Sequence, residues 1–167
     1  MKKVVLFSVI FALVLCLIDT AIISHLRFLK FRLDIVLILL VFIASYNGSL
    51  VGVVSGFFSG LVLDLLSLAP LGLHSAIFVI IAFVIGKLYG RYNLSRIFVP
   101  MLLTVFACLA QAGLLYLLRF IFGNNIAVPN LALIGFWIGF VINVSLAPIL
   151  FAVFTLFSNL LKVREIL

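Results

Sequence analysis

Charged residues are scarce in this chain, and acidic residues are the scarcest. Only 9% of the 167 residues are charged, and four Asp and Glu stand against eleven Lys and Arg. A soluble domain is about one quarter charged and about half apolar, whereas 68% of this chain is apolar and its mean hydropathy is +1.55. A chain of this length cannot enclose so much apolar surface in a core of its own. The composition therefore excludes a soluble globular domain and predicts an integral membrane protein.

Patterns of residues that carry catalysis or bind metals are missing as well. The two cysteines, Cys16 and Cys108, lie inside apolar runs, which is typical of small buried side chains. The two histidines, His25 and His74, have no second ligand four residues away, so their spacing does not favour a metal site. There is also no nucleophile–base pair, phosphate-binding loop, dinucleotide fingerprint or cysteine cluster. We expect no catalytic residue, no metal and no cofactor.

The basic residues are dispersed between apolar runs and are not gathered in one patch. The formal net charge of +7 therefore indicates orientation in a membrane, because Lys and Arg are retained on the cytoplasmic side. Nucleic acid is not an expected partner.

Short polar breaks divide the chain into six apolar segments, at residues 4–24, 33–46, 48–66, 73–89, 97–118 and 131–161. They predict an all-α membrane protein, a six-helix transmembrane bundle, in a single multi-pass domain over residues 1–167. Segment 33–46 is shorter than the roughly 20 residues that cross a bilayer upright. It is either tucked inside the bundle or set in a locally thinned bilayer. Segment 131–161 exceeds one crossing, so we expect it to tilt, to bend near Pro148 or to project into the cytoplasm.

Six crossings place both termini on one side of the membrane. With the N-terminus inside, seven of the eleven Lys and Arg are cytoplasmic, including Lys87, Arg91 and Arg96 in one basic loop. This loop is expected to contact anionic lipid. Residues 25–32 alternate basic and apolar side chains, which is typical of a segment lying at the membrane interface.

A rival topology has five crossings. If residues 33–66 cross once, the N-terminus is external. We favour six crossings because Asn47-Gly48-Ser49 interrupts that run, which is too long for one crossing. Both topologies leave the basic loop and the C-terminus in the cytoplasm.

Glycine recurs at every fourth position in the third segment, at Gly48, Gly52, Gly56 and Gly60. A helix with this spacing has a nearly flat face, which lets another backbone approach closely. We expect these glycines to form a helix-packing face. The next step of the same spacing is Asp64.

A carboxylate such as Asp64 in a membrane helix needs a partner, water or a function. One interpretation is structural, with the carboxylate held by the Ser67 hydroxyl and by backbone amides of the following turn. The other is an acceptor that binds a partner. Pro70-Leu71-Gly72 predicts a turn, and His74 is expected to cap the helix that follows it.

Three further polar residues lie in or beside apolar runs. Asp34 directly precedes one of them, which predicts a helix N-cap. Gln111 and Asn143 are candidates for contacts between helices.

The residues from the glycine face to the turn have a specific order. It reads Gly52-x3-Gly56-Phe57-x2-Gly60-Leu61-x2-Asp64-x2-Ser67-x2-Pro70-Leu71-Gly72. With Asp34 before a short apolar helix, this order resembles the MreD family of rod shape-determining membrane proteins. Leu33 stands where that family usually has proline, which loosens the expected start of the second helix.

The resemblance implies a non-enzymatic scaffold of the cell-elongation machinery in the bacterial cytoplasmic membrane. MreD proteins act with MreC, and through it with the MreB filament and the peptidoglycan synthases. The resemblance also implies a fold like the substrate-binding membrane subunits of energy-coupling-factor vitamin transporters. We expect Asp64, Ser67, Pro70, Leu71, Gly72 and His74 to shape an outward cleft. MreC would dock either on the bundle or in that cleft, and a homo-oligomer is a further expectation.

The alternative function is that of such a vitamin-binding transporter subunit. Its helix architecture would be much the same, so fold alone cannot decide between the two. A vitamin that co-purifies would favour transport, and association with MreC would favour morphogenesis.

Overall fold

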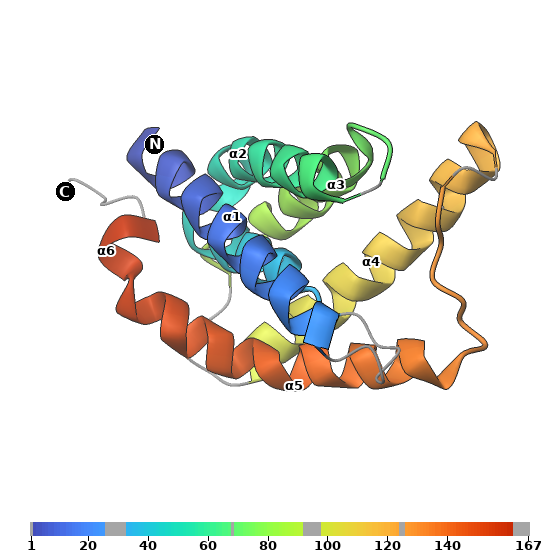
Figure 1. The fold of residues 1–167 in the computed structure, drawn as a ribbon. Helices are drawn as coiled ribbons and strands as arrows, with labels where there is room; N and C mark the ends of the chain where they lie inside the picture. Colours follow the sequence, from blue (N-terminus) through green and yellow to red (C-terminus); the bar gives the residue numbers. More distant parts are fainter. Residues whose placement is uncertain (1, 26–32, 68, 92–97, 124–125, 162–167) are drawn as a thin grey trace.

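The computed structural model describes residues 2–25, 33–67, 69–91, 98–123 and 126–161. Within these ranges all regular structure is α-helical, as the composition and segment lengths predicted. The helices, shown in Figure 1, are α1 (Lys2–His25), α2 (Ile35–Leu66), α3 (Leu73–Gly86), α4 (Phe98–Phe122), α5 (Ile134–Leu156) and α6 (Ser158–Leu161).

Helix α2 is folded back on itself at Gly48. This glycine has φ 81° and ψ 179°, which is not helical. A Cβ atom added to Gly52 would lie 2.9 Å from the Cβ atom of Ala44, although residues eight apart in a straight helix are about 12 Å apart. Residues 35–47, the first arm, and residues 49–66, the second arm, therefore form a helical hairpin. The predicted interruption at Asn47-Gly48-Ser49 is confirmed.

The first arm occupies the centre of the protein. Residues 36–45 are all buried, and the helices that contact α2 are α1, α3, α4 and α5. A helix that is apolar on every side is stable only where other elements enclose it. The short segment was expected either inside the bundle or in a locally thinned bilayer, and the structure shows it enclosed by the other helices.

One end of the protein collects both chain ends and the bend of α2. The Asn47 side chain donates a hydrogen bond to the carbonyl oxygen of Leu161 in α6, at 2.8 Å. Tyr89, just after α3, lies 3.8 Å from a Cβ atom added to Gly48. Helix α6 also contacts α1, and Figure 1 shows α6 near the start of α1.

Helices α4 and α5 are more exposed than α2 and α3. From the place where they contact the rest of the protein, the two helices run in different directions, as Figure 1 shows. By length and composition, α2, α4 and α5 are each apolar enough to cross a membrane. Helix α2 reaches that length only as the sum of two antiparallel arms, so it is not one straight crossing.

One prediction for the C-terminal apolar segment, residues 131–161, was a bend near Pro148. Helix α5 continues through Pro148 to Leu156, and the chain breaks at Phe157, whose N–H bonds to the carbonyl oxygen of Phe154. The short helix α6 follows. The helix is therefore not interrupted at Pro148, and its end lies nine residues later, at Phe157.

Candidate functional site

Three of the four spaced glycines lie against α3. A Cβ atom added to them would lie 2.5 Å from Ser75 Cα at Gly60, 3.1 Å from the Phe78 carbonyl oxygen at Gly56, and 3.5 Å from Ala82 Cβ at Gly52. Distances near 3 Å or less leave no room for a side chain. The backbones of the second arm and of α3 are therefore in direct contact.

Gly48 has a different place from the other three. It lies at the bend of α2, and glycine is required there because φ is positive. Close packing does not require it, since an added Cβ atom would lie 3.8 Å from Tyr89, an ordinary contact distance. The expectation that all four glycines share one face therefore does not describe Gly48. This residue permits the hairpin, because its φ and ψ are strained for any residue with a side chain.

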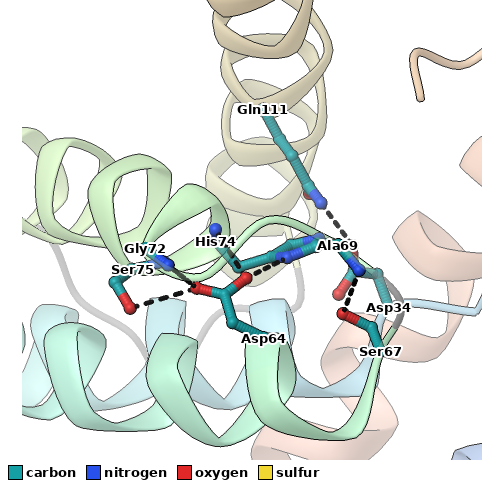
Figure 2. A network of polar contacts seen from close by, with 8 residues as sticks. All are labelled: Asp34, Asp64, Ser67, Ala69, Gly72, His74, Ser75 and Gln111. Carbon is teal, nitrogen blue, oxygen red and sulfur yellow. Dashed lines mark hydrogen bonds and ion pairs between the residues drawn. The ribbon is translucent and has the colours of Figure 1, made fainter. Parts of the chain in front are cut away.

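The Asp64 side chain is buried, and it joins α2 to α3. Its Oδ2 atom accepts hydrogen bonds from Gly72 N–H at 2.9 Å and from Ser75, through N–H at 3.4 Å and the hydroxyl at 3.3 Å. Its Oδ1 atom accepts from His74 N–H at 3.0 Å and lies 2.7 Å from His74 Nδ1. Figure 2 shows the carboxylate pointing from α2 to the first turn of α3.

This geometry makes Asp64 an N-cap supplied by another helix. The N-cap position of α3 is Gly72, at φ 93°, which has no side chain to accept the exposed amides of the first turn. A carboxylate at a helix N-terminus is also favoured by the helix dipole. Asp64 therefore fills a role that is usually local, and Gly72 allows the turn that brings α3 to it.

The remaining turn residues support this joint. The Ser67 hydroxyl accepts a hydrogen bond from Ala69 N–H at 3.4 Å, and the Pro70 carbonyl accepts from Leu73 N–H at 3.1 Å. The side chain of Leu71 is 71% exposed. In the expected arrangement the Ser67 hydroxyl held Asp64, whereas here it stabilises the turn. His74 was expected to cap the helix, and it instead flanks Asp64.

An apolar groove lies beside this turn. It has a volume of about 390 Å³ and runs between the start of α3 and the end of α4. Its lining residues include Leu71, Leu73, Ala76, Leu118, Phe122 and Ile126.

A second polar group lies where α4 and α5 meet the start of α2. The Gln111 side chain donates to Asp34 Oδ2 at 2.7 Å, as Figure 2 shows, and the Asp34 N–H donates to Asn143 Oδ1 at 3.0 Å. Asp34 is at the N-cap position of α2 but makes no side-chain capping bond. The sequence analysis identified each of these three residues as a candidate, but the spacing of residues in the sequence could not predict that they contact one another.

Part of the basic loop is visible. Lys87 follows α3, with Nζ 4.6 Å from the centre of the Phe83 ring, and Arg91 is exposed. Arg96 and the predicted interfacial residues 26–32 lie outside the described residues. Across the described ranges, no three His, Cys, Asp or Glu side chains are arranged to hold a metal ion.

Comparison with known proteins identifies one family. A family model described as rod shape-determining protein MreD matches residues 1–157. No curated protein matches the chain, and no solved structure does.

Proposed function

This chain belongs to the MreD family of rod shape-determining proteins, and from this premise we propose that it is a non-enzymatic scaffold of the bacterial cell-elongation machinery. The match over residues 1–157 carries the proposal. Asp64 supports it, because this buried acid of the family-like motif is occupied in joining two helices. The partner proposed from the family is MreC, which would link the scaffold to MreB and to the peptidoglycan synthases.

The proposed topology has six crossings in the cytoplasmic membrane, with both termini inside. The crossings would be α1, the two arms of α2, α3, α4 and α5. Three exposed cations support this orientation, because Lys3 is in the first turn of α1 and Lys87 and Arg91 follow α3, whose last residue Gly86 lies against the bend of α2. The first arm is about 20 Å long, which suffices because protein surrounds it.

The proposed docking site for MreC is the apolar groove beside the α2–α3 turn. It lies at the end opposite the termini, which this topology makes the outer end. Leu71 and Phe122 are 71% and 70% exposed there, and such apolar side chains in a concave site are typical anchors for a partner.

Filling the groove tests this docking. Ala76 lines the groove and is exposed, so Ala76→Trp would occupy the space without entering the core. We expect MreC recovered with the affinity-purified variant to fall at least about tenfold, and cells relying on the variant to become round.

The matched control is Ile80→Trp, one turn further along α3 and 47% exposed. It adds the same indole outside the groove, and we expect normal MreC recovery and rod shape. Equal recovery from both variants, at equal membrane levels, would disprove docking in the groove. If cells depleted of this protein remain rod-shaped, the proposed role in cell elongation is disproved.

A further inference from the structure

Two exposed cations follow the last turn of α3, at the end where α2 bends. Lys87 and Arg91 are both exposed, and Gly86, directly before Lys87, packs against the backbone of Ser49 beside the bend. Resting on the proposed topology, in which α3 crosses the membrane, we propose that this place binds an anionic phospholipid. The phosphate is held by the two cations, and an acyl chain lies along the outer face of α3.

A backbone turn holds the two cations close together. The N–H groups of Leu88 and Arg91 donate to the carbonyl oxygens of Ile85 and Leu88, at 2.9 and 3.1 Å. Gly90, the third residue of the turn from Leu88 to Arg91, has φ 75°, which favours glycine. The ends of such a turn lie within about 7 Å of each other. Lys87 adjoins one end and Arg91 is the other, so both long side chains can reach one phosphate group.

The Lys87 side chain runs back along α3. Its Nζ atom lies 4.6 Å from the centre of the exposed ring of Phe83, four residues earlier. A cation at the end of a membrane helix usually extends toward water. In the proposed topology the reverse direction leads toward the bilayer, so the ammonium group lies at the depth of the lipid head groups. Tyr89 is an exposed aromatic residue of the kind that marks this interface.

Neither cation has an acidic partner in the part of the chain that the structure describes. The ion pair found there joins His74 to Asp64. Asp34 precedes the first arm of α2 and Asp64 lies near the end of the second, each about 20 Å or more from the bend along its arm. An ammonium group carries three donors and a guanidinium group five. A phosphate supplies both the oxygen acceptors and the negative charge that these groups favour.

The neighbouring surface favours a lipid over an acidic segment of a soluble protein. Phe83 and Val84 are exposed, and they lie four and three residues before Lys87, on the same side of the helix. In the proposed topology this apolar surface faces the hydrocarbon, where a soluble protein does not reach. A phospholipid covers both parts of the site, because its phosphate is joined to acyl chains that extend into the bilayer.

Lipid binding by the purified protein tests the site. In a non-ionic detergent, native mass spectrometry measures the Kd of dioleoyl-phosphatidylglycerol and of the phosphatidylcholine with the same chains. We expect the parent protein to bind the anionic lipid about thirtyfold more tightly, for two cations near the phosphate. Equal affinity for the two lipids would overturn the proposal without reliance on a variant.

Charge-removing variants locate the site. Lys87→Gln and Arg91→Gln should each weaken phosphatidylglycerol binding about fivefold. The matched control is Lys3→Gln, which removes an exposed cation from the first turn of α1 and should change the Kd less than about twofold. Equal losses for Lys3→Gln and Lys87→Gln would show a diffuse attraction and overturn the site. Tighter binding by Glu165→Gln would overturn it too, because the chain's own acid would then serve the cations.

A photoreactive lipid tests the acyl contact. Phosphatidylglycerol with a diazirine in its acyl chain should label residues 83–84, mapped by tandem mass spectrometry, at least about fivefold more than the matching phosphatidylcholine. Soluble glycerophosphoglycerol and oligoglutamate, at the same concentration as the lipid, should not reduce this labelling. Displacement by either compound would show that charge alone is recognised and would overturn the assignment to a lipid.

Failure of the lipid site is distinguishable from failure of the proposed function. If the protein shows no preference for phosphatidylglycerol while MreC is still recovered, the lipid site fails and the scaffold stands. If the preference holds but MreC is not recovered, the lipid site stands and the docking of MreC fails.

Discussion

At the residue scale, Asp64 shows why a buried acid is retained in a membrane helix. Its two oxygens serve Gly72, His74 and Ser75 in the first turn of α3. Those backbone donors would otherwise be exposed in an apolar setting, where each unsatisfied group is costly. The Asp64 carboxylate therefore has a structural role, whether or not it also belongs to a binding site.

Replacing this carboxylate should weaken the joint. Asp64→Asn keeps the shape but puts an NH₂ group against N–H donors, so we expect a loss of about 3 kcal/mol in stability, measured by thermal unfolding in detergent. Ser67→Ala is the control, because that hydroxyl accepts one long bond of 3.4 Å. A smaller loss for Asp64→Asn than for Ser67→Ala would contradict this role.

The glycine contacts lead to a second prediction at this scale. A methyl group at Gly60 would lie 2.5 Å from the Ser75 backbone, whereas one at Gly113 would meet open space. Gly60→Ala should destabilise the protein by about 2 kcal/mol. Gly113→Ala should be neutral or stabilising, because alanine is the better helix former. Equal melting temperatures for the two variants would show that α2 and α3 are not so close.

Sequence spacing identified these residues but not their partners. Glycine at every fourth position predicts that something packs closely, and it does not say whether that is another helix of the chain or a second protein. The fold supplies the answer, which is α3 for Gly56 and Gly60 and, for Gly52, the first arm of α2, where Ala44 is the nearest neighbour. Likewise a structural role was one of two interpretations of the Asp64 carboxylate, and the cap it forms spans eight to eleven residues of chain.

At the element scale, the hairpin of α2 explains why the length of residues 33–66 does not match a whole number of membrane crossings. The run of residues 33–66 is too long for one crossing, and its first part is too short for another. The break was predicted from Asn47-Gly48-Ser49, since asparagine, glycine and serine favour turns. The enclosure of the first arm could not be read from the run, because a buried helix and a lipid-facing helix are equally apolar.

A distance measurement distinguishes the hairpin from a straight helix. Spin labels at positions 35 and 66 would be about 47 Å apart on a straight helix. On the hairpin we expect a distance below about 25 Å by double electron–electron resonance. Since Leu66 is exposed and Ile35 partly so, the labels should leave the core intact. A single distance population above about 40 Å would exclude the fold described here.

At the scale of the whole molecule, the start of α1 and helix α6 lie at one end, where Gly48 turns. The sequence predicted both termini on one side of the membrane from the number of segments and the distribution of Lys and Arg, and this topology stays a prediction. It could not predict how α4 and α5 meet α2, because Gln111 bonds to the side chain and Asn143 to the backbone N–H of Asp34, which is 77 and 109 residues away.

Labelling in intact cells tests the proposed orientation and separates it from the five-crossing rival. In a chain without its native cysteines, Lys3→Cys should resist a membrane-impermeant maleimide until the cells are permeabilised. Leu71→Cys, at a residue 71% exposed on the opposite end, should react from outside. Labelling of Lys3→Cys in intact cells would place the N-terminus outside.

The absence of any loop at Gly48 has a consequence for biogenesis. The two arms of α2 emerge from the ribosome one directly after the other, with only the short polar break Asn47-Gly48-Ser49 where the helix turns. In the proposed topology, the insertion machinery therefore receives two crossings with no hydrophilic loop between them, and we expect it to accept them together. Helices α4 and α5 are synthesised afterwards and close around a segment that lipid has held until then.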